Sequence, residues 1–415
     1  MASNSIDTPH KASTENQVND RLAVIYFLWI GGATNIGWYA ILNSIDFFND
    51  KLLQDCAFIF PLSPYVSQLI ATLMITQITN RFSYNTRIIT SVTLLMIMTA
   101  LVPLAAELFQ ETTFGMVLVM AFLFVVGFNN TVCYASAAGL TSQIGGKYTG
   151  SFLIGVALFG LTMNISKEIT VLLIDPNERA VLSNFVYFGF AIALIVGSLI
   201  LHGLFMKSEF YRVNVEEKVD EDSLSEDNET VLLKETNTPK KKQQPQREMK
   251  VLVEVGKQAK LYLILLVVIC IQQYMLYPGV MLKKEIPGME KHTKTVSMIT
   301  TFSVFYIAGK RIGQIRKIYN TNTTIVVTLS RFIFMAMFII QAVAKDILII
   351  SSPWFAYVNI AFFALTQGFL NVSLFILGPE QVKGDKKEVV GFLGVFALNI
   401  GSMIGAFSAL LFKKL

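Results

Sequence analysis

Residues 115–140 read GMVLVMAFLFVVGFNNTVCYASAAGL, a run of mostly apolar residues that contains two amides, Asn129 and Asn130. A helix rises about 1.5 Å per residue, so about 20 apolar residues cover a hydrocarbon core of roughly 30 Å. This stretch is therefore long enough to cross a bilayer as one helix. It decides the fold because runs of the same kind fill most of the remaining chain.

Eleven such runs are arranged in two groups, six before and five after a charged segment. We predict spans at residues 22–46, 56–79, 88–107, 115–140, 149–174, 180–206, 259–282, 293–309, 324–343, 354–378 and 388–412. The runs do not alternate apolar and polar residues, which excludes a membrane barrel. The sequence predicts an all-α polytopic membrane protein with 11 transmembrane helices in a 6+5 arrangement like that of major facilitator carriers.

The composition agrees with this class. Apolar residues make up 53% of the chain and charged residues only 15%, against a charged share of about 25% in soluble domains. The mean hydropathy is +0.55. A water-soluble fold would leave too much apolar surface in water, so this class is excluded.

Four segments follow from the pattern. Residues 1–21 form a polar cytosolic amino terminus, 22–206 a six-helix bundle, 207–258 a cytosolic loop, and 259–415 a five-helix bundle. The loop begins acidic, with EEKVDEDSLSEDNE, and ends basic, with KKKQQPQREMK. Because it has too few apolar residues to form a core, we expect it to be disordered.

The sequence carries no motif of a soluble enzyme: it has no HExxH, no GxSxG and no P-loop, and only three histidines. Cys56, Cys133 and Cys270 lie in or beside predicted spans and are expected to be small core residues, not a disulfide set. We therefore expect no catalytic residue, no metal and no cofactor.

Polar residues inside the spans mark the expected site, because a charge at mid-bilayer costs about 2.5–3.5 kcal/mol and needs a wet cavity or a partner. They are Asn35, Asn129, Asn130, Asn164, Lys167, Glu168, Gln272, Gln273, Lys310, Arg311, Arg331, Gln367, Asn371 and Asn399. Amides dominate this set and carboxylates are scarce. A neutral polar solute fits best, with Trp38, Tyr134, Phe305 and Tyr306 able to stack on a flat ring.

Several segments are similar to the equilibrative nucleoside transporter family. The most specific is FALTQGFLNVSLFILGPEQVKGDKKEVVGFLGVFALNIGSMIGAFSALLF at 363–412, which resembles the family's tenth span, GP loop and glycine-rich eleventh span. Here Gln367 stands at the usual Asn. DRLAVIYFLWIGGATNIGWYAI at 20–41 resembles the opening helix, with Trp38 as the matching tryptophan.

The remaining segments of the resemblance carry departures. In FSVFYIAGKRIGQ at 302–314, similar to the family's FxxFDxxGR signature, Tyr306 replaces the acid and Lys310 the arginine. In NNTVCYASAAGLTSQIGGKYTGSFLIGVALFG at 129–160, Asn130 falls at the usual glutamine. QQYMLYPGVML and SRFIFMAMF place Pro278 and Arg331 on recurrent positions.

The resemblance and the polar pattern together give a set of expected roles. The expected substrate-binding residues are Trp38, Asn35, Asn130, Tyr134, Ser303, Tyr306, Lys310, Gln367 and Asn371. Gating or packing is expected for Gly155, Gly160, Pro278, Arg331, Gly401 and Gly405. Plainer roles stay open: Trp38 also fits an interfacial anchor, Asn130 an interhelical bond, and Lys310 a positive residue at a cytosolic helix end.

We expect a transporter that moves nucleosides or nucleobases by alternating access between its two bundles, without an ion gradient and as a monomer in the plasma membrane. Neither an enzyme activity nor a nucleic-acid partner is expected. Two other classes stay open: a carrier of another small polar solute, such as a sugar or an amino acid, and a membrane receptor that binds without transport.

Overall fold

The computed structural model describes residues 9–52, 56–174, 176–216, 244–277, 279–282, 291–343, 352–384 and 386–412, and every regular element in these ranges is a helix. The α-helices are α1 (Pro9–Leu42), α2 (Ile45–Leu52), α3 (Cys56–Ile59), α4 (Leu62–Arg81), α5 (Tyr84–Leu108), α6 (Thr113–Ile144), α7 (Gly146–Leu173), α8 (Pro176–Met206), α9 (Glu209–Tyr211), α11 (Gln244–Leu276), α12 (Gly279–Leu282), α13 (Lys291–Gly313), α14 (Thr321–Val343), α15 (Pro353–Leu377) and α16 (Lys386–Ala409). Short π and 3-10 turns are η1 (Arg212–Glu216), η2 (Arg316–Ile318), η3 (Pro379–Gln381) and η4 (Leu410–Phe412).

Each of the eleven predicted spans coincides with a described helix of 20 residues or more. Nine of the described helices are long and apolar enough to cross a membrane; α4 and α13 fall outside that group. Both pack between other helices, α4 against α6 and α16, and α13 against α7 and α15. Protein neighbours in place of lipid let these two helices carry more Ser, Thr and Gln. The all-α polytopic prediction is confirmed.

Some helix boundaries differ from the prediction. Helix α1 begins at Pro9 and α11 at Gln244, well before the predicted span starts at 22 and 259. The prediction places a span where a run of about 20 apolar residues begins. A helix can begin earlier than that, because polar residues before the run can continue the same helix into water. The predicted loop is therefore helical at both described ends, and its middle, 217–243, lies outside the described residues.

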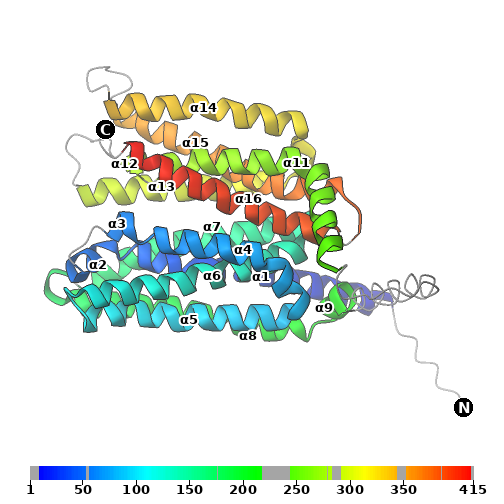
Figure 1. Cartoon of the computed structure of the whole chain (residues 1–415), viewed down its shortest axis with the longest axis horizontal. Coiled ribbons are helices and arrows are strands. Elements are labelled where there is room, and N and C mark those ends of the chain that lie inside the picture. The colour runs from blue at the N-terminus through cyan, green and yellow to red at the C-terminus, as the bar shows by residue number, and fades with distance from the viewer. Residues whose placement is uncertain are drawn as a thin grey trace, which may run out of the picture.

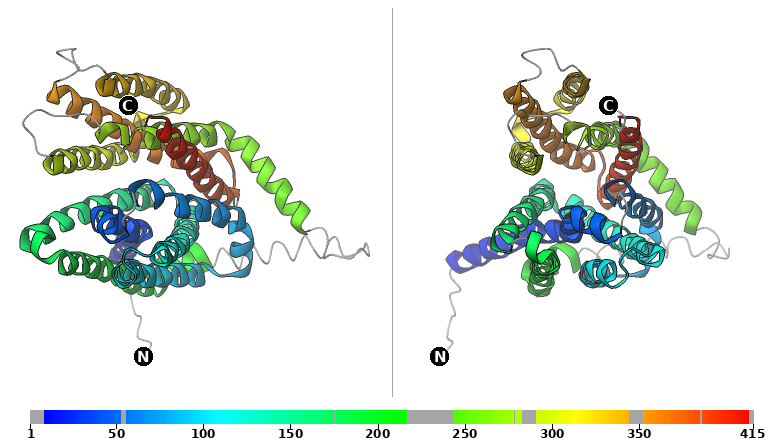
Figure 2. Two further views of the ribbon diagram at one scale, coloured as in Figure 1. Left: turned by 60° about the vertical axis from the view of Figure 1, so that its left-hand side comes forward. Right: turned by 90° about the vertical axis from the view of Figure 1, so that its left-hand side faces the viewer.

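The helices form two bundles that lie side by side with their axes running in one general direction (Figure 1). Helices α1–α9 make one half and α11–α16 the other, as both views of Figure 2 also show. Helix α1 begins at one end of the bundle and α16 ends at the other, which an odd number of spans requires. With a cytosolic amino terminus, the end that holds α9 is the cytosolic end.

The two halves meet through α6 and α4 against α16, and through α7 against α13 and α15. At the α6–α16 crossing a Cβ added to Gly391 would lie 2.8 Å from the Cα of Gly139. Only glycine allows two backbones to approach so closely. This crossing lies near the carboxyl end of α6 and the amino end of α16.

Burial separates central from peripheral helices. In the apolar window of α15, 78% of residues are buried inside the protein, against 28% for α14 and 33% for α8. The peripheral helices expose large apolar side chains such as Ile200, Val326 and Ile333. Lipid is the surrounding that such a surface requires. Helix α15 therefore occupies the core of its half, where its polar residues are shielded from lipid.

Candidate substrate site between the two halves

Asn35 and Asn130, two residues predicted to bind substrate, contact each other within the amino-terminal half. Asn130 Nδ2 on α6 donates a hydrogen bond of 3.0 Å to Asn35 Oδ1 on α1, and Asn35 Nδ2 donates to Thr34 Oγ1 at 2.9 Å. Asn130 is only 7% exposed. The pair joins residues 95 positions apart and fixes the height of α1 against α6.

Six tyrosines from both halves gather around the middle of the interface, and we call them the central tyrosines: Tyr39, Tyr65 and Tyr134 from the amino-terminal half, and Tyr274, Tyr277 and Tyr306 from the carboxyl-terminal half. The rings of Tyr65 and Tyr274, one from each half, lie 6.3 Å apart. The Tyr306 ring lies 4.4 Å from the Nζ of Lys310, which donates a hydrogen bond to Leu153 of the opposite half. Aromatic rings with hydroxyl groups are therefore contributed to the interface by both halves.

Only two of the central tyrosines, Tyr134 and Tyr306, were expected from the sequence. Tyr134 packs edge-on against Phe152 at 4.9 Å. The four missed residues had a usable signal: Tyr274 and Tyr277 share a helical face with Cys270, and Tyr39 follows Trp38. Trp38 itself is partly buried against the core of its half.

Lys310 joins the halves. Its Nζ donates a hydrogen bond of 2.6 Å to the main-chain oxygen of Leu153 on α7 and lies 4.4 Å from the centre of the Tyr306 ring. The side chain is 1% exposed. Ser303, one turn before Tyr306, is half-buried. The lysine that was predicted to bind substrate therefore forms a hydrogen bond with the opposite half.

Gln367 and Asn371 lie one turn apart on α15 and are 0% and 4% exposed. Gln367 Nε2 donates a hydrogen bond of 2.6 Å to Gln273 Oε1 on α11. Within the described ranges, Gln367 Oε1 and Asn371 Oδ1 are buried without a hydrogen-bond partner. Gln273 was noted in the sequence as a polar residue but not as a binding residue.

Arg331 ties three helices of the carboxyl-terminal half together. From the middle of α14 its Nε donates to Gln272 Oε1 at 2.9 Å, and its Nη1 donates to Phe363 O at 2.8 Å and Thr366 Oγ1 at 2.9 Å. The guanidinium carbon lies 4.2 Å from the Phe363 ring centre. These partners are all in one half, so they stabilise that bundle; a gating role stays a prediction.

A family model described as "Nucleoside transporter" matches residues 120–414 of this sequence. The chain belongs to the nucleoside transporter family. A search of curated proteins finds no match.

Among solved structures, the E. coli fucose:proton symporter is 15% identical, with a TM-score of 0.58 over 93% of this chain and 89% of that one. A major facilitator superfamily proton:xylose symporter, in a complex with 6-bromo-6-deoxy-D-glucose, is 13% identical, with a TM-score of 0.62 over 97% and 89%. At this identity the likeness shows the fold alone. This member of the nucleoside transporter family is therefore a multi-pass membrane transporter with the major facilitator architecture, and its cargo is a small molecule.

The glycines expected to pack or gate in this transporter lie at close helix contacts, two of them beside central tyrosines. A Cβ on Gly160 would lie 2.9 Å from the Tyr39 ring, and one on Gly405 would lie 3.0 Å from the Tyr274 Cβ. A Cβ on Gly401 would lie 2.7 Å from the Cys270 Cβ, and one on Gly155 would lie 1.7 Å from the Leu28 oxygen. Each glycine therefore allows a close helix approach. Pro278 lies outside the described residues.

Further contacts join the two halves near the end of the interface that holds α9. Gln143 Nε2 on α6 donates to Glu388 Oε2 on α16 at 3.1 Å, and the Gln314 side chain on the loop after α13 covers Gly150 of α7. Together with Lys310 and Leu153 they form a layer of contacts between the halves, which we call the cytosolic layer because we expect the amino terminus at this end to be cytosolic.

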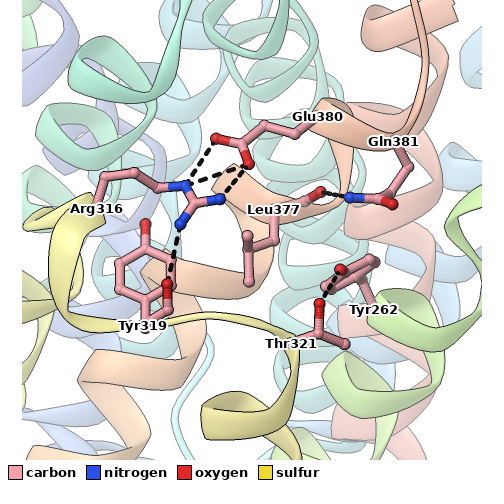
Figure 3. Close-up of polar contacts among 7 residues, drawn as sticks. All are labelled: Tyr262, Arg316, Tyr319, Thr321, Leu377, Glu380 and Gln381. Carbon is pink, nitrogen blue, oxygen red and sulfur yellow. Dashed lines mark hydrogen bonds and ion pairs between the residues drawn. The ribbon is translucent and has the colours of Figure 1, made fainter.

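The segments that follow α13 and α15 are joined by a separate ion pair (Figure 3). Arg316 Nη2 donates to Glu380 Oε2 at 2.9 Å, and its Nε donates to both carboxylate oxygens. These hydrogen bonds raise the pKa of Arg316 above its ordinary value. Nearby, the hydroxyl groups of Tyr262 and Thr321 lie 2.8 Å apart. An exposed pair of this kind contributes about 1 kcal/mol or less, so it orients the loops more than it stabilises the fold.

Proposed function

We propose that this protein carries nucleosides or nucleobases across the plasma membrane, down their concentration gradient, as a monomer. The observation that carries the proposal is the set of central tyrosines contributed by both halves, together with the Asn35–Asn130 and Gln273–Gln367 amide pairs. Aromatic rings stack on a flat base and amides match its polar edge. Membership of the nucleoside transporter family supports the same cargo.

The transport step is a rocking of one half against the other around the central tyrosines. The substrate enters while the cytosolic layer of Lys310, Leu153, Gln143 and Glu388 is closed. That layer then separates and the outer side closes. Tyr39, Tyr65 and Tyr134 move with one half and Tyr274, Tyr277 and Tyr306 with the other, so the same rings contact substrate from both sides. The step forms no covalent bond.

The equilibrative mode is supported by the distribution of charge. Proton-driven carriers need a group that gains and loses a proton within the transport path. Glu107, Glu168 and Glu388 lie within two turns of the ends of α5, α7 and α16. The family's span-eight acid is Tyr306 here. The charged side chains near the central tyrosines are Lys310 and Arg331.

The test is uptake into proteoliposomes that contain the full-length protein. We expect saturable uptake of labelled adenosine or hypoxanthine that does not change when a pH gradient is imposed, and exchange when unlabelled substrate is loaded inside. Uptake that needs the gradient would show a proton-coupled carrier. Inhibition by glucose or an amino acid, without nucleoside uptake, would assign another cargo. Binding without accumulation would identify a receptor.

A further inference from the structure

Two buried carboxamides, Gln273 and Gln367, form a pair with unused hydrogen-bonding capacity. The 2.6 Å bond from Gln367 Nε2 to Gln273 Oε1 uses one donor and one acceptor. Gln367 Oε1 has no hydrogen-bond partner among the described residues, and the side chain of Gln367 is fully buried. An unpaired buried acceptor is unfavourable unless something bonds to it in another state of the protein.

Other polar clusters of this half differ from this pair. Gln272 accepts from Arg331 and donates to Thr328 O, so its carboxamide is used on both sides. Asn359 Nδ2 donates to Gln341 Oε1 at 3.4 Å, and neither amide of that pair has a buried unpartnered atom in the described ranges. A purely structural role accounts for these residues. It does not account for the free acceptor of Gln367.

The pair lies where a substrate can reach it. Gln273 shares the face of α11 that carries Cys270 and Tyr277, and the ring of its neighbour Tyr274 lies 6.3 Å from the ring of Tyr65 in the opposite half. The Tyr277 ring stacks on Phe302 at 4.0 Å. A flat ligand against the central tyrosines would therefore have its edge directed toward Gln273 and Gln367.

The two amides offer a donor beside an acceptor, whichever way they are turned. With the bond as described, Gln273 keeps its Nε2–H donor and Gln367 its Oε1 acceptor. If both carboxamides rotate by half a turn, the mutual bond is kept, and the free acceptor is then on Gln273 and the free donor on Gln367. The pair can thus present either polarity to a ligand without losing its own hydrogen bond.

We propose that Gln273 and Gln367 together bind the edge of a nucleobase on which a hydrogen-bond donor adjoins an acceptor. Adenine presents N6–H beside N1, and hypoxanthine presents the reverse, O6 beside N1–H. Concerted rotation of the amides matches both, so the site accepts amino and oxo bases alike. It rejects bases on which that edge is blocked or missing. This inference rests on the proposed function.

The test measures uptake of labelled inosine and adenosine into proteoliposomes, with unlabelled analogues as competitors. Competitors with an altered edge are 1-methylinosine, N6,N6-dimethyladenosine and purine riboside. For the unmodified protein we expect each to compete at least about tenfold less well than the parent nucleoside, since a site with paired polar groups discriminates strongly against a ligand that leaves them unbonded. Equal competition would overturn the inference and leave the proposed function standing. No uptake of any nucleoside or base would overturn both.

Two variants assign the effect to the pair. Gln273→Met and Gln367→Met keep the side-chain length and remove the amide; we expect weaker inosine and adenosine uptake, while the preference over purine riboside falls to about one, because an apolar side chain cannot tell the edges apart. Gln341→Met removes an amide from the other pair and should keep the preference. A variant that loses uptake of all compounds in the same proportion would overturn the inference, because only a structural role would then remain.

Discussion

The Nζ atom of Lys310 lies 2.6 Å from the main-chain oxygen of Leu153, and this hydrogen bond joins α13 of one half to α7 of the other. Lys310 is 1% exposed, and its Nζ lies against the Tyr306 ring. A cation on a carbonyl oxygen is a strong bond in a low-dielectric setting. The bond stabilises the arrangement in which α13 and α7 are in contact.

Lys310→Met should therefore favour opening toward the cytosol. Loss of a charged hydrogen bond costs about 1.5–3 kcal/mol, which corresponds to a shift in the conformational equilibrium of roughly tenfold to a hundredfold. The measurement is the labelling rate of a cysteine introduced by Gln314→Cys, with an impermeant maleimide on the cytosolic side. Lys167→Met is the control, because Lys167 contacts Ser44 and Asn184 within one half. Equal labelling rates in Lys310→Met and in the parent protein would contradict a role of the Lys310–Leu153 hydrogen bond in keeping the halves together at this end.

Asn130→Ala should remove most nucleoside uptake while the protein still reaches the membrane. It deletes the 3.0 Å bond to Asn35 and leaves the Asn35 oxygen unpaired at the site. A lost buried hydrogen bond of this kind costs about 1–3 kcal/mol. Asn129→Ala is a matched control, since the hydrogen bond that Asn129 donates among the described residues goes to Val125 O of its own helix. Initial uptake rates normalised to surface protein distinguish the two; similar rates would remove Asn130 from the site.

Gly155→Ala should destabilise the amino-terminal half. Its new Cβ would lie 1.7 Å from the Leu28 oxygen of α1, so the helices would have to separate. Such overpacking costs about 1–3 kcal/mol or more. At Gly189 a Cβ meets nothing within 4 Å, so Gly189→Ala should be neutral or slightly stabilising. Thermal unfolding in detergent tests both, and an unchanged Tm for Gly155→Ala would refute the close contact.

Arg331→Met should lower the stability of the carboxyl-terminal half, because it removes hydrogen bonds to Gln272, Phe363 and Thr366. We expect a loss of about 3 kcal/mol or more, since several buried acceptors lose their donor together. Arg331→Lys should recover only part of this, because an ammonium lacks the planar fork. Arg311→Met, at an exposed position, is the control. The melting temperature in detergent is the readout; equal shifts for Arg331→Met and Arg311→Met would contradict the network.

Sequence reasoning located the helices well and their polar partners poorly. The criterion of about 20 apolar residues is local, so each predicted span matches a described helix. It missed the water-exposed starts of α1 and α11 because helix formation there does not depend on lipid. The amides were recognised as unusual within spans. The sequence could not predict that Gln367 forms a hydrogen bond with Gln273, which lies 94 positions away.

The sequence by itself determined that this protein is an all-helical membrane transporter of two bundles, because bilayer thickness translates directly into the length of apolar runs, and because motifs near the carboxyl end resemble one transporter family. Only the tertiary structure decided which residues face one another. Tyr65 meets Tyr274 and Lys310 meets Leu153 across the halves, and Gly139 lies against Gly391 where α6 crosses α16. Contacts of that kind depend on how whole helices pack, and no local pattern of residues encodes them.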